Sequence, residues 1–294
     1  MAAKHVRNAT VRTPPVHESK RPRGGTGHLE KPTVQALPSN NDMEVSTIEQ
    51  YSGLDFSGVE AVPLRVLVTG FGKFPGVRTN PTAVLIHALG RHRTRLARLG
   101  IDLELATLPV RYAGVARKLE ELDETLKPDA ILHFGLAARR KFFSIETRAL
   151  NRLSLVHRDA LRARAGRLAI IPGAPYAARA TFPCRQIEAA FRREDLRGRL
   201  SIEAGDYVCN ETLYLSLARS HARVIGFIHV PQLARANRPK KASRGRRPSV
   251  GDIIRAAIIA ILAVARKLRQ DLAKDLRSMS THHNFVKRLG KGPD

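Results

Sequence analysis

Cys209 and His229 are the residues of this sequence whose types and spacing most directly suggest chemistry. Cys209 ends a short extended run, and Asn210, a residue type common at helix N-caps, follows it. His229 lies at the end of the apolar run 224–230. A thiol near neutral pH is mostly protonated, so a nucleophilic cysteine needs an imidazole beside it and gains from the positive end of a helix. The pair therefore predicts a thiol-dependent hydrolase.

The same residue types also have structural interpretations. A lone cysteine is more often a small buried side chain than a nucleophile, but the strand-to-helix position of Cys209 favours the nucleophile. Cys184 fits the apolar face of a helix, and His133 fits a core histidine bonded to a backbone carbonyl. Apart from the terminal pair His282 and His283, no His or Cys pair has zinc-ligand spacing, so neither a metal nor a cofactor is expected.

Apolar runs alternating with amphipathic segments make up the chain from residue 64 onward. This alternation predicts an α/β fold: one three-layer domain with a twisted, mostly parallel sheet covered by helices on both faces. Strands are expected at 65–69, 102–108, 130–134, 200–203 and 224–230, and helices at 81–89, 113–126, 184–193, 211–219 and 250–272. Ligands gather at the carboxyl ends of parallel strands. The loops that follow residues 69, 134 and 230 would meet there, and the second of these loops is expected to carry Glu146.

The chain divides by composition into three parts. Residues 1–62 are rich in Pro, Thr, Ser, Asn and Gly and are expected to form a disordered, basic and polar extension. Residues 63–273 form the α/β domain with a flexible basic loop at 235–248, and residues 274–294 form a basic tail.

Charge and hydropathy limit the partners and the compartment. The 51 Lys and Arg residues exceed the 26 Asp and Glu residues, which gives a formal net charge of +25 and suggests a polyanion partner. No nucleic-acid reader motif or stacking platform accompanies the charge, so nucleic acid is not the expected partner. Two cysteines and no signal-peptide core favour a cytoplasmic protein, and the apolar run 256–265 is too short to span a membrane.

Four collinear motifs resemble those of the pyroglutamyl peptidase I family, also called pyrrolidone carboxyl peptidases, which are cysteine peptidases that remove an N-terminal pyroglutamate. The likeness covers about residues 64–268. The motifs are Val66 to Phe71 with Phe74 and Asn80 to Thr82, Pro128 to Asn151, Ala204 to Asn210, and Gly226 to Pro231. Four motifs in the same order are more specific than any one of them.

The resemblance implies a role for each matched position. It makes Cys209 the nucleophile, His229 the general base and then acid, and Glu146 the carboxylate that orients the imidazole, in a Cys-His-Glu triad with an acyl-enzyme. The substrate-binding residues that it implies are Phe71 and Phe74 against the lactam ring, with Asn80, Tyr207 and Val208 beside it. It also implies peptide substrates with a blocked N-terminus and, because family members often form dimers or tetramers, a homo-oligomer.

Several positions next to these motifs differ from the family pattern. Thr147 and Arg148 follow the glutamate, Arg139 replaces a glycine, and Gln232 replaces a tyrosine. The segment 154–158 lacks the arginine that the family carries there, which leaves Arg152 or Arg158 as replacements. Two alternatives to an active peptidase therefore stay open. The chain is either a divergent family member with weak or lost activity that binds capped peptides, or a basic scaffold that binds acidic partners.

Overall fold

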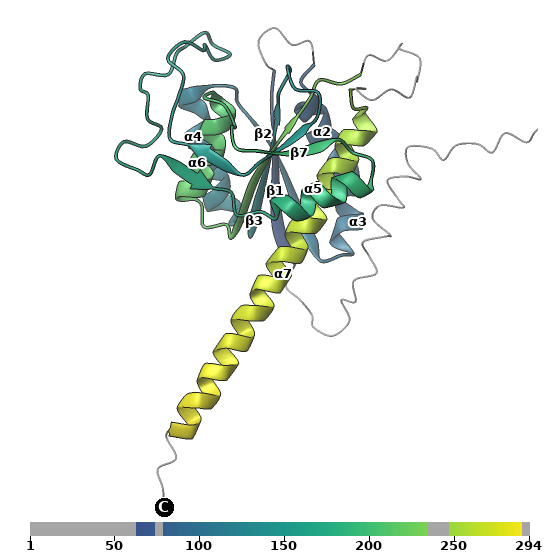
Figure 1. Cartoon of the computed structure of the whole chain (residues 1–294), viewed down its shortest axis with the longest axis vertical. Helices are drawn as coiled ribbons and strands as arrows, with labels where there is room; N and C mark the ends of the chain where they lie inside the picture. Colours follow the sequence, from purple (N-terminus) through teal and green to yellow (C-terminus); the bar gives the residue numbers. More distant parts are fainter. Residues whose placement is uncertain (1–62, 74–78, 235–246, 290–294) are drawn as a thin grey trace, which may run out of the picture. The chain divides into compact units, whose positions relative to one another are not determined.

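A six-stranded sheet forms the centre of the computed structural model, which describes residues 63–73, 79–234 and 247–289, with side chains up to residue 278. Its strand order is β2-β1-β3-β8-β4-β7. Figure 1 shows the sheet nearly edge-on, with helices on both sides of it. The strands are β1 (Leu64–Phe71), β2 (Ile101–Leu108), β3 (Ala130–Leu136), β4 (Phe143–Glu146), β7 (Gly198–Ser201) and β8 (Val224–Val230). The expected extension at 1–62, most of the expected loop at 235–248, and Phe74 lie outside the described residues.

The sheet is mostly parallel, with one antiparallel pair. Strand β1 runs parallel to β2 and β3, β3 runs parallel to β8, and β4 runs parallel to β7. Strand β4 is antiparallel to β8, and this reversal determines where Glu146 lies. A separate antiparallel pair joins β5 (Arg148–Leu150) to β6 (Ala177–Arg179).

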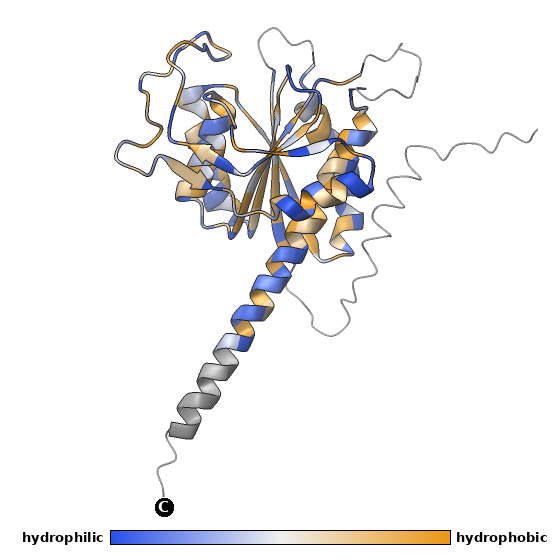
Figure 2. Ribbon diagram, in the orientation of Figure 1, coloured by the Kyte–Doolittle hydropathy of each residue, from blue (hydrophilic) through white to orange (hydrophobic). Residues whose placement is uncertain are grey.

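Helices cover both faces of the sheet, which confirms the predicted three-layer α/β fold. One face packs against α2 (Pro81–Leu89), α5 (Cys184–Arg193) and α7 (Val250–Leu289), and the other packs against α4 (Tyr112–Leu126) and α6 (Val208–Arg219). The short helix α3 (Arg93–Ala97) lies beside β2. The strands between the helix layers are apolar (Figure 2), as expected for a sheet buried on both faces.

Helix α7 continues well beyond its expected end at residue 272. Ser249 and Asp252 begin it with reciprocal side-chain bonds to each other's backbone N–H groups, at 2.8 Å and 3.1 Å. Its buried apolar residues extend from Ile253 to Leu268. Beyond them the side chains are increasingly exposed, and Figure 2 shows this part as more hydrophilic. The sequence contains no Gly or Pro between 252 and 289, so no residue of either type interrupts the helix there.

Among the helices that the structure describes, none is long and apolar enough to cross a bilayer.

Candidate active site

Glu146 and His229 meet across the antiparallel pair β4 and β8. In this register Glu146 is opposite Phe227, and His229 is opposite Ser144. The Nδ1 atom of His229 lies 2.8 Å from the Oε1 atom of Glu146, and both side chains are buried. Glu146 was expected in a strand-end loop. That expectation is wrong, because Glu146 is the last residue of β4 and reaches the imidazole diagonally across the sheet.

Cys209 approaches the same point from helix α6. A Cβ atom placed on Gly135 would lie 2.9 Å from the Cys209 sulfur, so the sulfur lies against the backbone of β3. Gly135 is the register partner of His229 on β8. Three segments that are distant in the sequence therefore converge: α6 carries the thiol, β8 the imidazole and β4 the carboxylate.

The start of α6 differs from the sequence-based expectation. The helix begins at Val208, with Tyr207 as an extended N-cap residue that makes no side-chain capping bond. Asn210 was expected to be the N-cap, and this is wrong. It lies within the first turn, and its amide bonds the N–H of Leu150 at 2.9 Å and the carbonyls of Leu150 and Arg152 at 2.7 Å and 3.0 Å. Asn210 therefore fastens α6 to β5, and Cys209 lies in the first turn of the helix.

The thiol of Cys209 is held in its protonated form. The residue is partly exposed, but its sulfur is enclosed, and this burial raises the pKa of the thiol to about 12. The Glu146 carboxylate also raises this pKa, whereas the Arg140 guanidinium and a backbone N–H lower it. A thiol with such a pKa needs a base to become a nucleophile at neutral pH.

Arg140 is a part of the site that the sequence-based reasoning missed. Its Nη1 atom lies 2.6 Å from the Oε1 atom of Glu146, the same oxygen that contacts His229. Its Nη2 atom donates to the carbonyl of Glu203 at 2.7 Å. Nothing in the sequence distinguishes this arginine from the many others.

Neither of the arginines considered as replacements contacts the buried carboxylate. Arg152 bonds the Glu203 carboxylate at 3.0 Å, and Arg158 donates to the carbonyl of Arg162 at 2.9 Å. The guanidinium next to Glu146 therefore comes from the turn after β3 and not from the segment that follows β5.

A narrow hollow of about 10 Å³ lies beside the thiol. Its lining consists of Phe71, Asn80, Val110, Leu136, Tyr207, Val208 and Cys209. Four of the five residues expected to bind substrate are among these, and the fifth, Phe74, is outside the described residues.

Asn80 uses its amide within the protein. The Oδ1 atom of Asn80 accepts from the N–H of Thr82 at 3.1 Å, and this bond caps the start of α2. Its Nδ2 atom donates to the carbonyl of Gly72 at 2.8 Å. The side chain therefore fixes the loop after β1 as well as lining the hollow.

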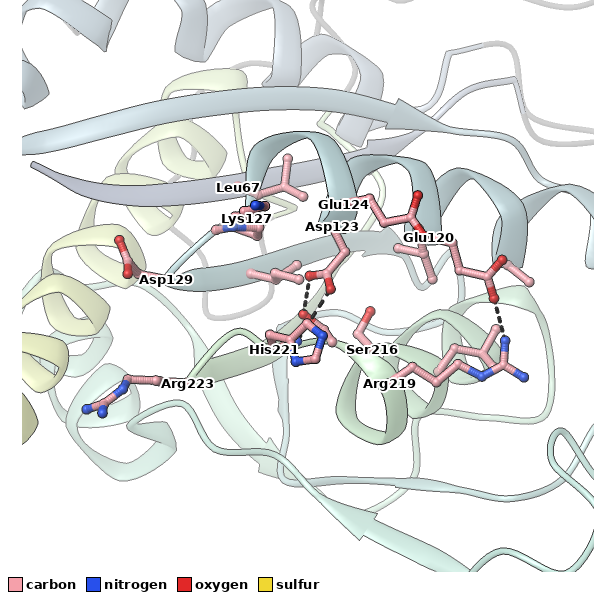
Figure 3. A pocket seen from close by; sticks show the side chains of 16 residues that line it. Leu67, Glu120, Asp123, Glu124, Lys127, Asp129, Ser216, Arg219, His221 and Arg223 are labelled. Atoms are coloured by element: carbon pink, nitrogen blue, oxygen red, sulfur yellow. Dashed lines mark hydrogen bonds and ion pairs between the residues drawn. The ribbon is translucent and has the colours of Figure 1, made fainter.

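A larger cavity, of about 660 Å³, lies between α4 and α6 (Figure 3). Polar groups on its wall bond to one another: Arg219 pairs with Glu120 at 2.6 Å, and Asp123 accepts from the N–H of His221 at 3.4 Å. None of the three residues of the expected triad lines it. This larger cavity is therefore separate from the Cys209 site.

His133 lies in the core, as expected, but with different partners. Its ring nitrogens contact the hydroxyls of Thr69 at 2.7 Å and Ser216 at 3.0 Å instead of a backbone carbonyl. Complete burial lowers the pKa of His133 to about 3, so the ring is neutral at physiological pH.

Comparison with known proteins gives consistent matches. The family model described as pyroglutamyl peptidase matches residues 64–267. A pyrrolidone-carboxylate peptidase of Pyrococcus furiosus is 34% identical over 179 residues, which cover 58% of this chain and 82% of the relative. Another from Thermoanaerobacter sp. strain X514 is 30% identical over 212 residues, covering 70% of this chain and 100% of the relative.

Solved structures give the same result. The crystal structure of pyrrolidone carboxyl peptidase from Thermus thermophilus superposes with a TM-score of 0.59 at 32% identity, covering 67% of this chain and 99% of that chain. A mutant pyrrolidone carboxyl peptidase from the hyperthermophile Pyrococcus furiosus superposes with a TM-score of 0.59 at 29% identity, covering 70% of this chain and 100% of that chain.

Proposed function

Because this chain belongs to the pyroglutamyl peptidase family and is a hydrolase of that type, we propose that Cys209, His229 and Glu146 carry out its reaction, the removal of an N-terminal pyroglutamyl residue. The observation that carries the proposal is the 2.8 Å contact between His229 and Glu146, together with the sulfur of Cys209 against Gly135, the strand partner of His229.

The imidazole supplies the base that the buried thiol lacks. Glu146 accepts the Nδ1–H of His229, which leaves Nε2 as the nitrogen that exchanges protons. In the first step the Cys209 proton moves to Nε2 while the sulfur bonds to the pyroglutamyl carbonyl carbon. Burial favours the neutral thiol, so at neutral pH the proton leaves mainly by transfer to this base.

The beginning of α6 is suited to the charge that develops on the substrate. Attack turns the carbonyl oxygen into an oxyanion, and backbone N–H groups at a helix N-terminus stabilise such a charge. No side chain caps this end of the helix, so its first-turn amides are not occupied by a capping group. The oxyanion would therefore form next to the amides of the turn that carries Cys209.

Completion of the reaction returns every group to its starting state. The tetrahedral intermediate collapses as its C–N bond breaks, and the proton held on His229 passes to the leaving amine. His229 then takes a proton from water, which attacks the thioester. The C–S bond then breaks, His229 returns its proton to the sulfur, and pyroglutamate leaves with the Cys209 thiol restored.

The hollow beside Cys209 matches the chemistry of a neutral, flat ring. Phe71, Val110 and Val208 give it apolar walls, and a charged free N-terminus would lose its hydration there without a partner. The hollow is narrower than a lactam ring, so binding requires its walls to move outward. Peptides with a pyroglutamyl N-terminus are thus the proposed substrates, and the same peptides with a free N-terminal glutamate are excluded.

Replacing each cysteine in turn tests the proposal. Cys209→Ala is expected to lower release of the fluorophore from a pyroglutamyl amide by on the order of 10⁴-fold or more, as loss of a nucleophile does. Cys184→Ala is the matched control, because Cys184 is also partly buried and burial raises its pKa to about 11. Full activity in Cys209→Ala, or equal losses in the two variants, would contradict the proposal.

A further inference from the structure

We propose that Arg140 is a positioning residue of this site, which holds the Glu146 carboxylate in place and balances its charge so that His229 and Cys209 can exchange a proton. This inference rests on the proposed function, because it assigns a role within the same catalytic group. Arg152 and Arg158 were the arginines expected to replace the one that the family carries. The proposal assigns the arginine of this site to Arg140 instead.

Arg140 and His229 contact the same oxygen of a fully buried carboxylate. The Glu146 side chain has no exposed surface, whereas the Arg140 side chain is 28% exposed and reaches in from the turn after β3. The Nη1 atom of Arg140 and the Nδ1 atom of His229 lie 2.6 Å and 2.8 Å from the same oxygen, Oε1. A buried carboxylate is costly unless its charge is paired, and a guanidinium supplies a permanent positive charge.

The far side of Arg140 is anchored as well. Its Nη2 atom donates to the carbonyl of Glu203 at 2.7 Å, and Nη1 also lies 3.4 Å from the hydroxyl of Ser201 at the end of β7. The guanidinium thus joins the turn after β3 to β4 and to the end of β7. This anchoring fixes the carboxylate, and the carboxylate in turn fixes the orientation of the imidazole.

Charged and titratable groups from several elements face Glu146. Arg140 comes from the turn after β3, His229 from β8, Cys209 from α6, and Cys184 from the first turn of α5, where the carboxylate contributes to its raised pKa. Among these groups Arg140 alone carries a fixed positive charge, which is also the side-chain charge that lowers the pKa of Cys209.

Removing the positive charge of Arg140 should shift the pH–rate profile in one direction. Without the guanidinium, the negative charge of the carboxylate would attract a proton on the imidazole more strongly. The thiol of Cys209 would also lose a cation that favours its ionised form. In the variant, the acid limb of the pH–rate profile therefore moves to higher pH. This holds whether the reactive form is a neutral thiol beside a neutral imidazole or a thiolate beside an imidazolium.

The variants Arg140→Met, Arg140→Lys and Arg139→Met test this role. In Arg140→Met we expect kcat to fall by about 10- to 100-fold with KM changed less than about threefold, and the acid limb to move upward. Arg140→Lys keeps the charge and is expected to recover the position of the limb and part of kcat. Arg139→Met removes an equal charge from the adjacent exposed position and is expected to behave as wild type.

A second readout does not depend on the substrate. The rate at which iodoacetamide alkylates Cys209, located by mass spectrometry, follows the thiolate fraction. Its pH profile should lie at higher pH in Arg140→Met than in Arg139→Met. If the two profiles coincide, the inference is wrong even where the enzyme is active; if they differ but no pyroglutamyl substrate is cleaved, the inference stands and the proposed function fails.

Discussion

The pKa of Cys209 gives a prediction for a variant that lacks the base. In His229→Asn the rate is expected to fall by about 10²- to 10⁴-fold at pH 7, the usual contribution of a general base. The residual rate should then rise about tenfold for each pH unit from 7 to about 9.5. The reason is that the thiolate fraction of a group whose pKa is about 12 grows in that proportion well below its pKa.

A matched histidine variant separates this effect from a general one. His221→Asn changes an exposed histidine on the wall of the α4–α6 cavity and should keep the wild-type pH profile. A residual rate in His229→Asn that stays flat from about pH 7 to 9.5 would show that Cys209 ionisation does not limit the reaction.

The roles of Cys209 and His229 could be predicted from their residue types and from their positions at the ends of predicted elements. Only the family resemblance singled out Glu146, because its partner lies 83 positions away and across an antiparallel pair. Arg140 was not predicted, because arginine is abundant in a chain with 51 basic residues. A buried contact to one oxygen atom depends on the tertiary structure, and sequence spacing does not encode it.

At the scale of elements, the lack of a side chain at Gly135 on β3 allows helix α6 to pack closely against the sheet. A Cβ atom there would lie 2.6 Å from the Phe227 ring and 2.9 Å from the Cys209 sulfur, both shorter than real contacts. Gly135→Ala is therefore expected to displace the thiol, lower kcat by about 10²-fold and reduce the melting temperature by several degrees.

Gly90→Ala is the control for that substitution. A Cβ atom on Gly90 meets nothing within 4 Å, and the residue has ordinary helical angles. It should leave activity unchanged and stability equal or slightly higher, because alanine reduces the entropy of the unfolded chain. Equal activity in Gly135→Ala and Gly90→Ala, measured by steady-state kinetics and thermal unfolding, would show that the close packing at Gly135 is not needed.

Long periodic elements were predicted well, whereas short ones and exact boundaries were not. Strands β4, β5 and β6 contain three or four residues each, too few for a clear alternating pattern. Asn210 has the residue type of an N-cap, but tertiary bonds to β5 use its amide, and the helix begins earlier. The capping propensity of Asn210 is therefore overridden by its hydrogen bonds to an element that is distant in the sequence.

At the scale of the whole molecule, the alternation of apolar runs and amphipathic helices was enough to predict the three-layer fold. The antiparallel position of β4 was not predictable, since the pattern of a buried strand does not state its direction. This reversal is the feature that carries Glu146 to His229. The cavity between α4 and α6 is much larger than the hollow beside Cys209, so cavity size alone would have directed attention away from Cys209.

The most direct measurement of the central claim is a rapid-quench experiment with an activated pyroglutamyl ester. An ester acylates the enzyme faster than water removes the acyl group, so the intermediate accumulates. We predict that mass spectrometry of the acid-quenched protein finds one added pyroglutamyl group, located on Cys209, formed with the burst of released alcohol. Turnover of the ester without any pyroglutamyl group on Cys209, or with the group on another residue, would contradict the account.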